Sequence, residues 1–148
     1  MMGATGYVGR LRECVGHDLL LSPAAAACIC DEEGRILLLR RSDGDDLWGF
    51  PGGAIEPDER ADEAVVREVR EETGLHVTPA RAGDPFRVEL ETQVMVVHPV
   101  LARVPADVQI TLDRENQAYR WIEPREVYNL PHVPQLEDDF IALGLLPG

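Results

Sequence analysis

Cations are scarce in this sequence. Its 148 residues contain 14 arginines and no lysine, against 27 aspartates and glutamates, for a formal net charge of −13. Binding to DNA or RNA requires clustered cations that neutralise the phosphates, so this balance argues against a polymeric nucleic acid as partner. A small polyphosphate can still bind if a divalent cation inverts the local field.

Long apolar runs and cysteines are also few. The longest apolar stretches, 24–30 and 36–39, are far shorter than the roughly 20 residues of a membrane-spanning helix, so we expect no membrane contact. Cys14, Cys28 and Cys30 cannot all pair within one chain, and we expect reduced thiols. A metal pair at Cys28 and Cys30 would lack a second Cys/His pair at ligand spacing. Because no secretion signal is recognisable, we expect a cytoplasmic location.

The hydrophobic pattern predicts one α/β domain over residues 1–148. Tyr7, Leu11 and Cys14 lie at helical spacing on a first helix that packs against the body or against a partner subunit. Pro99 interrupts a strand and predicts an edge position or a bulge. The remaining elements are a hairpin of strands 24–30 and 35–39, a loop at 40–46, a helix at 61–72, strands at 86–90, 93–104 and 119–122, and a helix at 134–143.

Carboxylates are concentrated between residues 53 and 75, where the sequence is Gly53-x5-Glu59-x7-Arg67-Glu68-Val69-x-Glu71-Glu72-x-Gly74-Leu75. On a helix, Glu68, Glu71 and Glu72 occupy positions i, i+3 and i+4, so their side chains share one patch. They would repel one another without a cation, and hard oxygen ligands of this kind suit Mg²⁺ or Mn²⁺. A run of glutamates on a helix is more often a solvated face.

At every defined position this spacing matches the signature of the Nudix hydrolase superfamily, the Nudix box (residues 53–75, called the box below), and the sequence resembles its MutT-like members. The resemblance implies a mixed β-sheet sandwiched between α-helices, and Mg²⁺- or Mn²⁺-dependent hydrolysis of a pyrophosphate bond in a nucleoside diphosphate linked to another moiety. It also implies that Arg67 holds Glu59 or a box carboxylate in place. The implied metal ligands are the carbonyl of Gly52 and the carboxylates of Glu68, Glu71 and Glu72.

Further candidates lie inside and outside the box. Glu71 and Glu115 compete for the role of general base; Glu115 resembles the loop glutamate that MutT-like members present to the metal, and the alternative is an exposed loop carboxylate. Four residues near the box are candidate substrate contacts, although arginines in loops are often solvated and aromatics often pack in the core. They are Arg40, Arg41, Trp48 and Phe50.

The box leaves the substrate open. Residues 90 and 91 hold Leu and Glu where ADP-ribose pyrophosphatases of this family tend to carry proline, and no tyrosine lies at the spacing typical of diadenosine-polyphosphate hydrolases. We therefore expect a nucleoside triphosphate, including an oxidised one, with a nucleotide sugar or ADP-ribose as the alternative. A regulatory domain that binds a nucleotide without turnover is an alternative of another class. Family analogy also suggests a homodimer.

Overall fold

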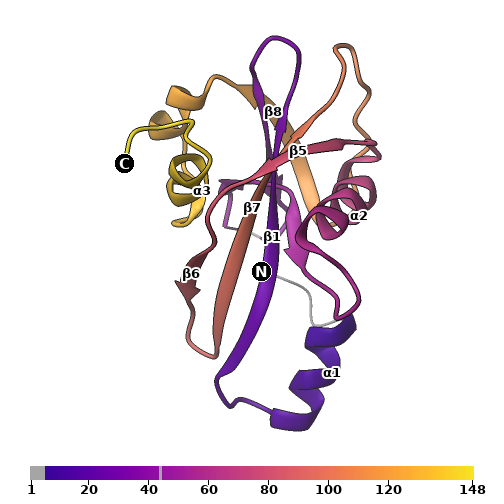
Figure 1. The fold of residues 1–148 in the computed structure, drawn as a ribbon, viewed down its shortest axis with the longest axis vertical. Coiled ribbons are helices and arrows are strands. Elements are labelled where there is room, and N and C mark those ends of the chain that lie inside the picture. Colours follow the sequence, from indigo (N-terminus) through magenta and orange to yellow (C-terminus); the bar gives the residue numbers. More distant parts are fainter. Residues whose placement is uncertain (1–5, 44) are drawn as a thin grey trace.

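A mixed β-sheet forms the centre of the computed structural model, which describes residues 6–43 and 45–148; residue 44 of the predicted loop lies outside them. The strands are β1 (Leu20–Cys30), β2 (Ile36–Arg41), β3 (Trp48–Gly49), β4 (Gly52–Ala54), β5 (Thr78–Ala82), β6 (Phe86–Glu89), β7 (Gln93–Arg103) and β8 (Asn116–Ile122). The helices are α1 (Gly6–Val15), α2 (Ala61–Thr73) and α3 (Leu136–Ala142), with a 3-10 helix η1 (Pro124–Asn129) (Figure 1).

β1 and β7 run parallel and side by side through the middle of the sheet, in register from Leu20 opposite Gln93 to Cys30 opposite Arg103. The other pairings, including those of β2 with β8 and of β4 with β1, are antiparallel. Because β4 pairs with β1 at Ala24–Ala26, Gly52 and Gly53, where the box begins, are fixed against the central strand. The rigid part of the sheet therefore positions the start of the box.

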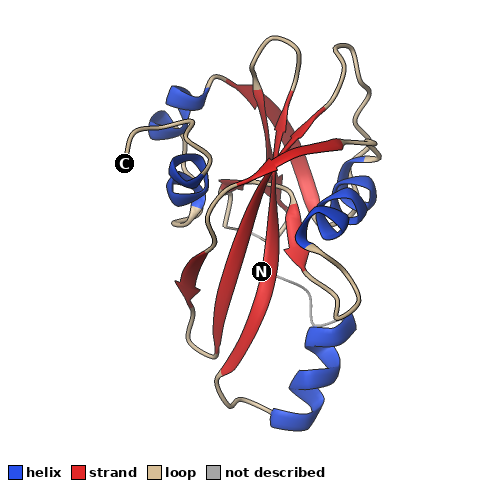
Figure 2. Cartoon of the chain, viewed as in Figure 1, coloured by secondary structure: helices blue, strands red, loops and turns tan. Residues whose placement is uncertain are grey.

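Helices cover the sheet on two sides: α2 on one, α3 and η1 on the other (Figure 2). Side chains alternate along β1, so Ala27 and Ile29 join the apolar face of α2, while Cys28 packs with Leu136 and Phe140 of α3. This arrangement confirms the predicted mixed sheet sandwiched between α-helices. In the described residues, no helix has the length and apolar character needed to cross a membrane.

Several local predictions need correction. In α1 the buried side chain is Val8, whereas Cys14 of the predicted face is exposed, and polar contacts also join the helix to the body. One of them is the hydrogen bond from the Tyr7 amide to Glu56 Oε2, at 3.2 Å. The predicted loop at 40–46 begins too early, since Arg40 and Arg41 continue β2 and pair with β8.

Pro99 is neither at an edge nor in a bulge. It lies inside β7, opposite Ala26 of β1 on one side and, on the other, between the segments that pair with β6 (94–97) and with β5 (100–103), where its carbonyl accepts from the Gly83 N–H and its missing N–H interrupts neither pairing. β5, β3, β4 and η1 escaped prediction because they are short, and β5 carries no alternation of buried and exposed residues.

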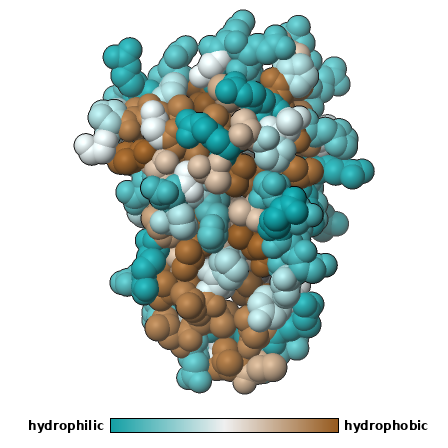
Figure 3. Space-filling model, in the orientation of Figure 1, coloured by the Kyte–Doolittle hydropathy of each residue, from teal (hydrophilic) through white to brown (hydrophobic). Residues whose placement is uncertain are grey.

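Hydrophobic side chains are exposed at the end of the sheet nearest α1. Figure 3 shows them gathered over the lower part of this face. The large apolar residues exposed near this end include Leu19, Leu21 and Leu90, with 67%, 65% and 47% of their surface accessible. The suggested homodimer stays a prediction.

Candidate active site

α2 carries most of the predicted site, and its ends are defined by local chemistry. The amide of Arg60 donates to Glu63 Oε1 at 2.9 Å, which satisfies a backbone group at the beginning of the helix. Gly74 ends the helix with φ of +75°, and its N–H donates to the carbonyl of Arg70. Val65 and Val69 are fully buried against the sheet, and Glu68 and Glu72 lie beside them on the helix, against the Gly52–Gly53 backbone of β4.

Arg67 is the centre of the hydrogen-bond network in the box. Its Nε and Nη2 donate to the two carboxylate oxygens of Glu59 at 2.7 and 2.8 Å, a bidentate pair. Nη2 also donates to the carbonyl of Ala54 at 3.0 Å, and Nη1 donates to Glu68 Oε1 at 2.9 Å. A longer contact of 3.5 Å joins Nη1 to Glu71 Oε2. The predicted return of Arg67 to Glu59 and to a box carboxylate is confirmed.

Glu72 is 4% exposed, and the amide of Gly52 donates to its Oε1 at 3.1 Å. Burial, and after it the negative charge of Glu68, raises the pKa of Glu72 to about 9. Burial also raises the pKa of Glu68, which Arg67 partly offsets, and the two carboxyl groups are hydrogen-bonded to each other. Burial therefore disfavours the charged forms of these two carboxyl groups when nothing cationic lies between them. A cation bound beside them would offset this cost.

The backbone at β4 approaches these carboxylates closely. A Cβ atom on Gly53 would lie 2.4 Å from Glu68 Oε1, and one on Gly52 would lie 2.2 Å from the carbonyl oxygen of Ala25. Any side chain at either position would displace a neighbour. The two glycines are therefore a steric requirement of the site.

The carboxylates of Glu68, Glu71 and Glu72 do not converge on one point in this structure. Within residues 6–43 and 45–148, no group of three His, Cys, Asp or Glu side chains is arranged to hold a metal ion. Glu68 and Glu72 lie together, whereas the Glu71 carboxylate is 57% exposed and turned toward Arg67. The donor set still fits a hard divalent cation, because it offers carboxylate oxygens and a glycine backbone without soft ligands.

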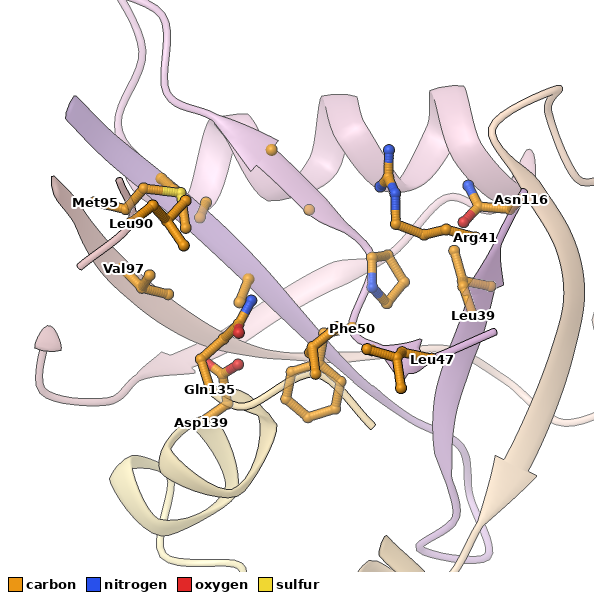
Figure 4. A pocket seen from close by; sticks show the side chains of 18 of the residues that line it. Leu39, Arg41, Leu47, Phe50, Leu90, Met95, Val97, Asn116, Gln135 and Asp139 are labelled. Atoms are coloured by element: carbon orange, nitrogen blue, oxygen red, sulfur yellow. The ribbon is translucent and has the colours of Figure 1, made fainter. Parts of the chain in front are cut away.

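A pocket of about 390 Å³ begins beside these glycines and extends along β1 to α3 (Figure 4). Of the four predicted substrate contacts, Arg41 and Phe50 line it. Trp48 is 8% exposed and packs in the core, with the Arg40 guanidinium over its ring at 5.4 Å from the centroid. Neither Arg40 nor Trp48 lines this pocket, and their role stays a prediction.

Glu115 lies at the beginning of the segment that leads into β8. Its exposed carboxylate is 3.5 Å from an Arg41 nitrogen, and its carbonyl accepts a hydrogen bond from the Ser42 amide. The predicted loop glutamate thus contacts an arginine of the pocket wall.

Sequence reasoning missed three polar residues that line the pocket. Gln135, just before α3, and Asp139, within α3, lie together at one end, whereas Asn116, which begins β8, lies beside Arg41 (Figure 4). Asp139 belongs to a run of acidic residues, which a sequence reader assigns to a solvated face. The spacing of the buried residues Leu136, Phe140 and Leu143 is what places position 139 on the inward face of the closing helix.

Comparisons with known proteins agree with this geometry. A CTP pyrophosphohydrolase of Escherichia coli (strain K12) is 37% identical over 124 residues, covering 79% of this chain and 90% of the relative. An asymmetrical bis(5'-nucleosyl)-tetraphosphatase of Mus musculus is 33% identical over 106 residues, covering 68% and 72%. Among solved structures, the MutT protein from Methanosarcina mazei Go1 superposes with a TM-score of 0.71 at 28% identity, covering 82% of this chain and 91% of that one.

The solution structure of the E. coli ORF135 protein is similar as well, with a TM-score of 0.70 and 30% identity over 85% of this chain and 92% of that one. The NUDIX domain family itself matches residues 20–143, which include the whole box and most of the sheet. The chain therefore belongs to the Nudix family, and it is a hydrolase that acts on phosphoric anhydrides.

Proposed function

We propose that this protein hydrolyses a pyrophosphate bond of a nucleoside triphosphate, including an oxidised one, with Mg²⁺ or Mn²⁺ as cofactor, in a single domain over residues 1–148. The observation that carries the proposal is the position of Glu68 and Glu72 against the Gly52–Gly53 backbone, where the Gly52 amide donates to Glu72 and Gly53 leaves room only for the Glu68 carboxylate. Support for the substrate class comes from the 37% identity to a CTP pyrophosphohydrolase.

Four groups would hold the cation in this proposal: the carbonyl of Gly52 and the carboxylates of Glu68, Glu71 and Glu72. When bound, a divalent cation neutralises phosphate charge and lowers the pKa of a coordinated water. Arg67 keeps Glu68 in position while Glu59 in turn holds Arg67. Without a bound cation, the net charge of −13 would repel a polyphosphate substrate.

Glu71 is proposed as the general base. Its carboxylate is more exposed than those of Glu68 and Glu72, so it can reach a water molecule on the open side of the cluster and accept its proton. Glu115 is the alternative, although in this structure its carboxylate faces Arg41. Arg41 and Phe50 line the pocket that would take the nucleoside.

The test is hydrolysis of a panel of nucleoside triphosphates, ADP-ribose and nucleotide sugars, with Mg²⁺, with Mn²⁺ and with a chelator. We expect turnover of a triphosphate that the chelator abolishes and added Mg²⁺ restores. Preference for ADP-ribose or a nucleotide sugar would contradict the substrate class. Ligand binding without turnover of any compound would favour a regulatory domain instead.

The variants Glu71→Gln and Glu115→Gln would identify the general base. Loss of a general base typically costs about 10²–10⁴-fold in rate. Glu71→Gln is expected to lose at least this much kcat, and Glu115→Gln less. If Glu71→Gln kept more than about a tenth of the wild-type kcat, the assignment to Glu71 would be wrong.

A further inference from the structure

β6 lies at an edge of the sheet. In the described part of the chain it pairs with β7 alone, and Figure 1 shows it at the outer side of the sheet, below α3. The register runs from Phe86 opposite Val97 to Glu89 opposite Val94. The outer side of such a strand presents backbone N–H and C=O groups that a further strand can pair with.

The hairpin that joins β6 to β7 shows which backbone groups face outward. The Leu90 amide donates to the Gln93 carbonyl at 2.8 Å, so Leu90 turns its backbone groups toward β7. These groups alternate along an antiparallel strand, so Val88 also turns inward. Arg87 and Glu89 therefore direct their N–H and C=O groups away from β7.

The side chains of this edge have the same pattern in both directions. Residues 86–90 are Phe-Arg-Val-Glu-Leu, with opposite charges on the two sides of a central valine and an apolar residue at each end. The side chains of Arg87 and Glu89 are 65% and 75% exposed, and their Nη2 and Oε1 atoms are 3.7 Å apart. An exposed ion pair of this kind contributes little to stability, so both charges can take other partners.

We propose that two copies of this chain associate by antiparallel pairing of β6 with β6, about a twofold axis at Val88. In this register Arg87 of each copy lies opposite Glu89 of the other, and Phe86 lies opposite Leu90. The outward backbone groups of Arg87 and Glu89 then form the hydrogen-bonded pairs on the two sides of the Val88 pair.

The charges select this register. Opposite charges that face each other across two strands stabilise the pairing, and like charges destabilise it. A twofold axis at Arg87 would place two arginines face to face, and an axis at Glu89 would place two glutamates face to face. Only the axis at Val88 lets both outward residues meet the opposite sign.

The proposed interface is small, so the association should be weak. Residues 86–90 provide five residues from each copy, against about 20–30 a side in a stable complex. Pro85 ends the row, because it has no N–H to donate. We therefore expect a dissociation constant in the micromolar range or above. The inference does not depend on the reaction at the box.

Sedimentation velocity at protein concentrations from about 1 μM to 1 mM tests the association. The mass of the wild type should rise with concentration from 16.4 kDa toward twice this value. Arg87→Glu would oppose glutamate to glutamate, and Glu89→Arg would oppose arginine to arginine, so each variant alone should remain monomeric. The exposed Arg125→Glu, which changes the net charge as Arg87→Glu does, should dimerise like the wild type.

Mixing the two variants provides a rescue. In an equimolar mixture, Arg87→Glu and Glu89→Arg face each other with opposite charges at both positions and should form a heterodimer. The double variant Arg87→Glu/Glu89→Arg should form a homodimer again. Both substituted side chains are exposed, so circular dichroism should show the wild-type fold throughout.

Val88→Cys tests the register, in a Cys14→Ser background that removes an exposed thiol. Residues of a non-hydrogen-bonded pair have Cα atoms about 4.5 Å apart, which is within the range for a disulfide. Val88→Cys should therefore form a crosslinked dimer on oxidation. Leu90→Cys, opposite Phe86 of the other copy, should not.

Three outcomes would overturn the inference. A wild type that is monomeric at about 1 mM would mean that the exposed charges protect this edge from pairing. Charge variants that dimerise like the wild type, or fail to form a heterodimer when mixed, would place any association elsewhere. Equal crosslinking of Val88→Cys and Leu90→Cys would exclude the register. Since none of these measurements involves turnover, their result is independent of the proposed function.

Discussion

Arg67→Lys tests how the box holds its carboxylates. The substitution keeps the positive charge but replaces a planar guanidinium by a single ammonium group, which cannot reach both oxygens of Glu59 and also Glu68 and the Ala54 carbonyl. We expect two or three of these hydrogen bonds to be lost. The fold should survive, because Arg67 lies outside the apolar core that α2 shares with the sheet.

The size of the effect follows from the contacts. A hydrogen bond to a charged group contributes about 1.5–3 kcal/mol when buried. The side chains of Arg67 and Glu59 are 30% and 15% exposed, so water replaces part of what is lost. We therefore expect the free energy of unfolding to fall by about 1–3 kcal/mol. With a urea slope of about 1–3 kcal/mol per molar, the midpoint should fall by about 1 M.

Urea titration would be run on the wild type, Arg67→Lys, Glu59→Gln and the double variant, with the exposed Arg70→Lys as matched control. The Arg67 and Glu59 substitutions should be non-additive by at least about 0.5 kcal/mol, because they remove the same pair. We also expect kcat to fall more than 10-fold in Arg67→Lys, since Glu68 loses its support. A midpoint equal to that of Arg70→Lys, or strictly additive effects, would refute this account of Arg67.

Three further outcomes follow from the structure. Gly53→Ala would push the Glu68 carboxylate aside, so we expect a folded protein by circular dichroism with kcat/KM reduced at least about 10-fold. Asp139 has a raised pKa in the folded state, so the wild type should lose stability relative to Asp139→Asn as the pH rises above about 4. The loss should be at most about 1.4 kcal/mol per pH unit. Urea titrations of both proteins between about pH 4 and 7 would measure it. Asp31 has the opposite sign, because hydrogen bonds from Arg35 outweigh burial and lower its pKa. The wild type should therefore be more stable than Asp31→Asn above about pH 4 and lose this advantage in acid. Thermal melts of both proteins at about pH 3 and pH 7 would measure the difference.

Prediction from sequence worked where the decisive interactions are local. The helix over 61–72 depends on neighbouring residues, and Glu59 lies in the turn just before it, within reach of the long Arg67 side chain eight positions on. The hairpin of β1 and β2 is local for the same reason. Family resemblance added the Gly52 carbonyl, which no spacing argument could supply.

Prediction failed where distant segments meet. The end of the pocket at α3 joins β1, β7 and that helix, and the inward turn of Asp139 depends on how the closing helix packs on Cys28 and Leu38. Likewise, Pro99 is tolerated inside β7 because two different strands happen to pair on either side of it. Pro99 leaves no local signal of this kind, and for Asp139 the local signal is limited to the spacing of Leu136, Phe140 and Leu143.

Both ends of the pocket carry buried carboxyl groups. At the box, Glu68 and Glu72 are crowded together beside Arg67, and burial raises the pKa of both, so a divalent cation bound there would offset the cost of confining two negative charges. At α3, Asp139 is buried with no ion-pair partner among the described residues, and burial raises its pKa as well. Both ends of the pocket therefore disfavour an uncompensated carboxylate, which lowers the repulsion that a net charge of −13 would exert on an anionic substrate.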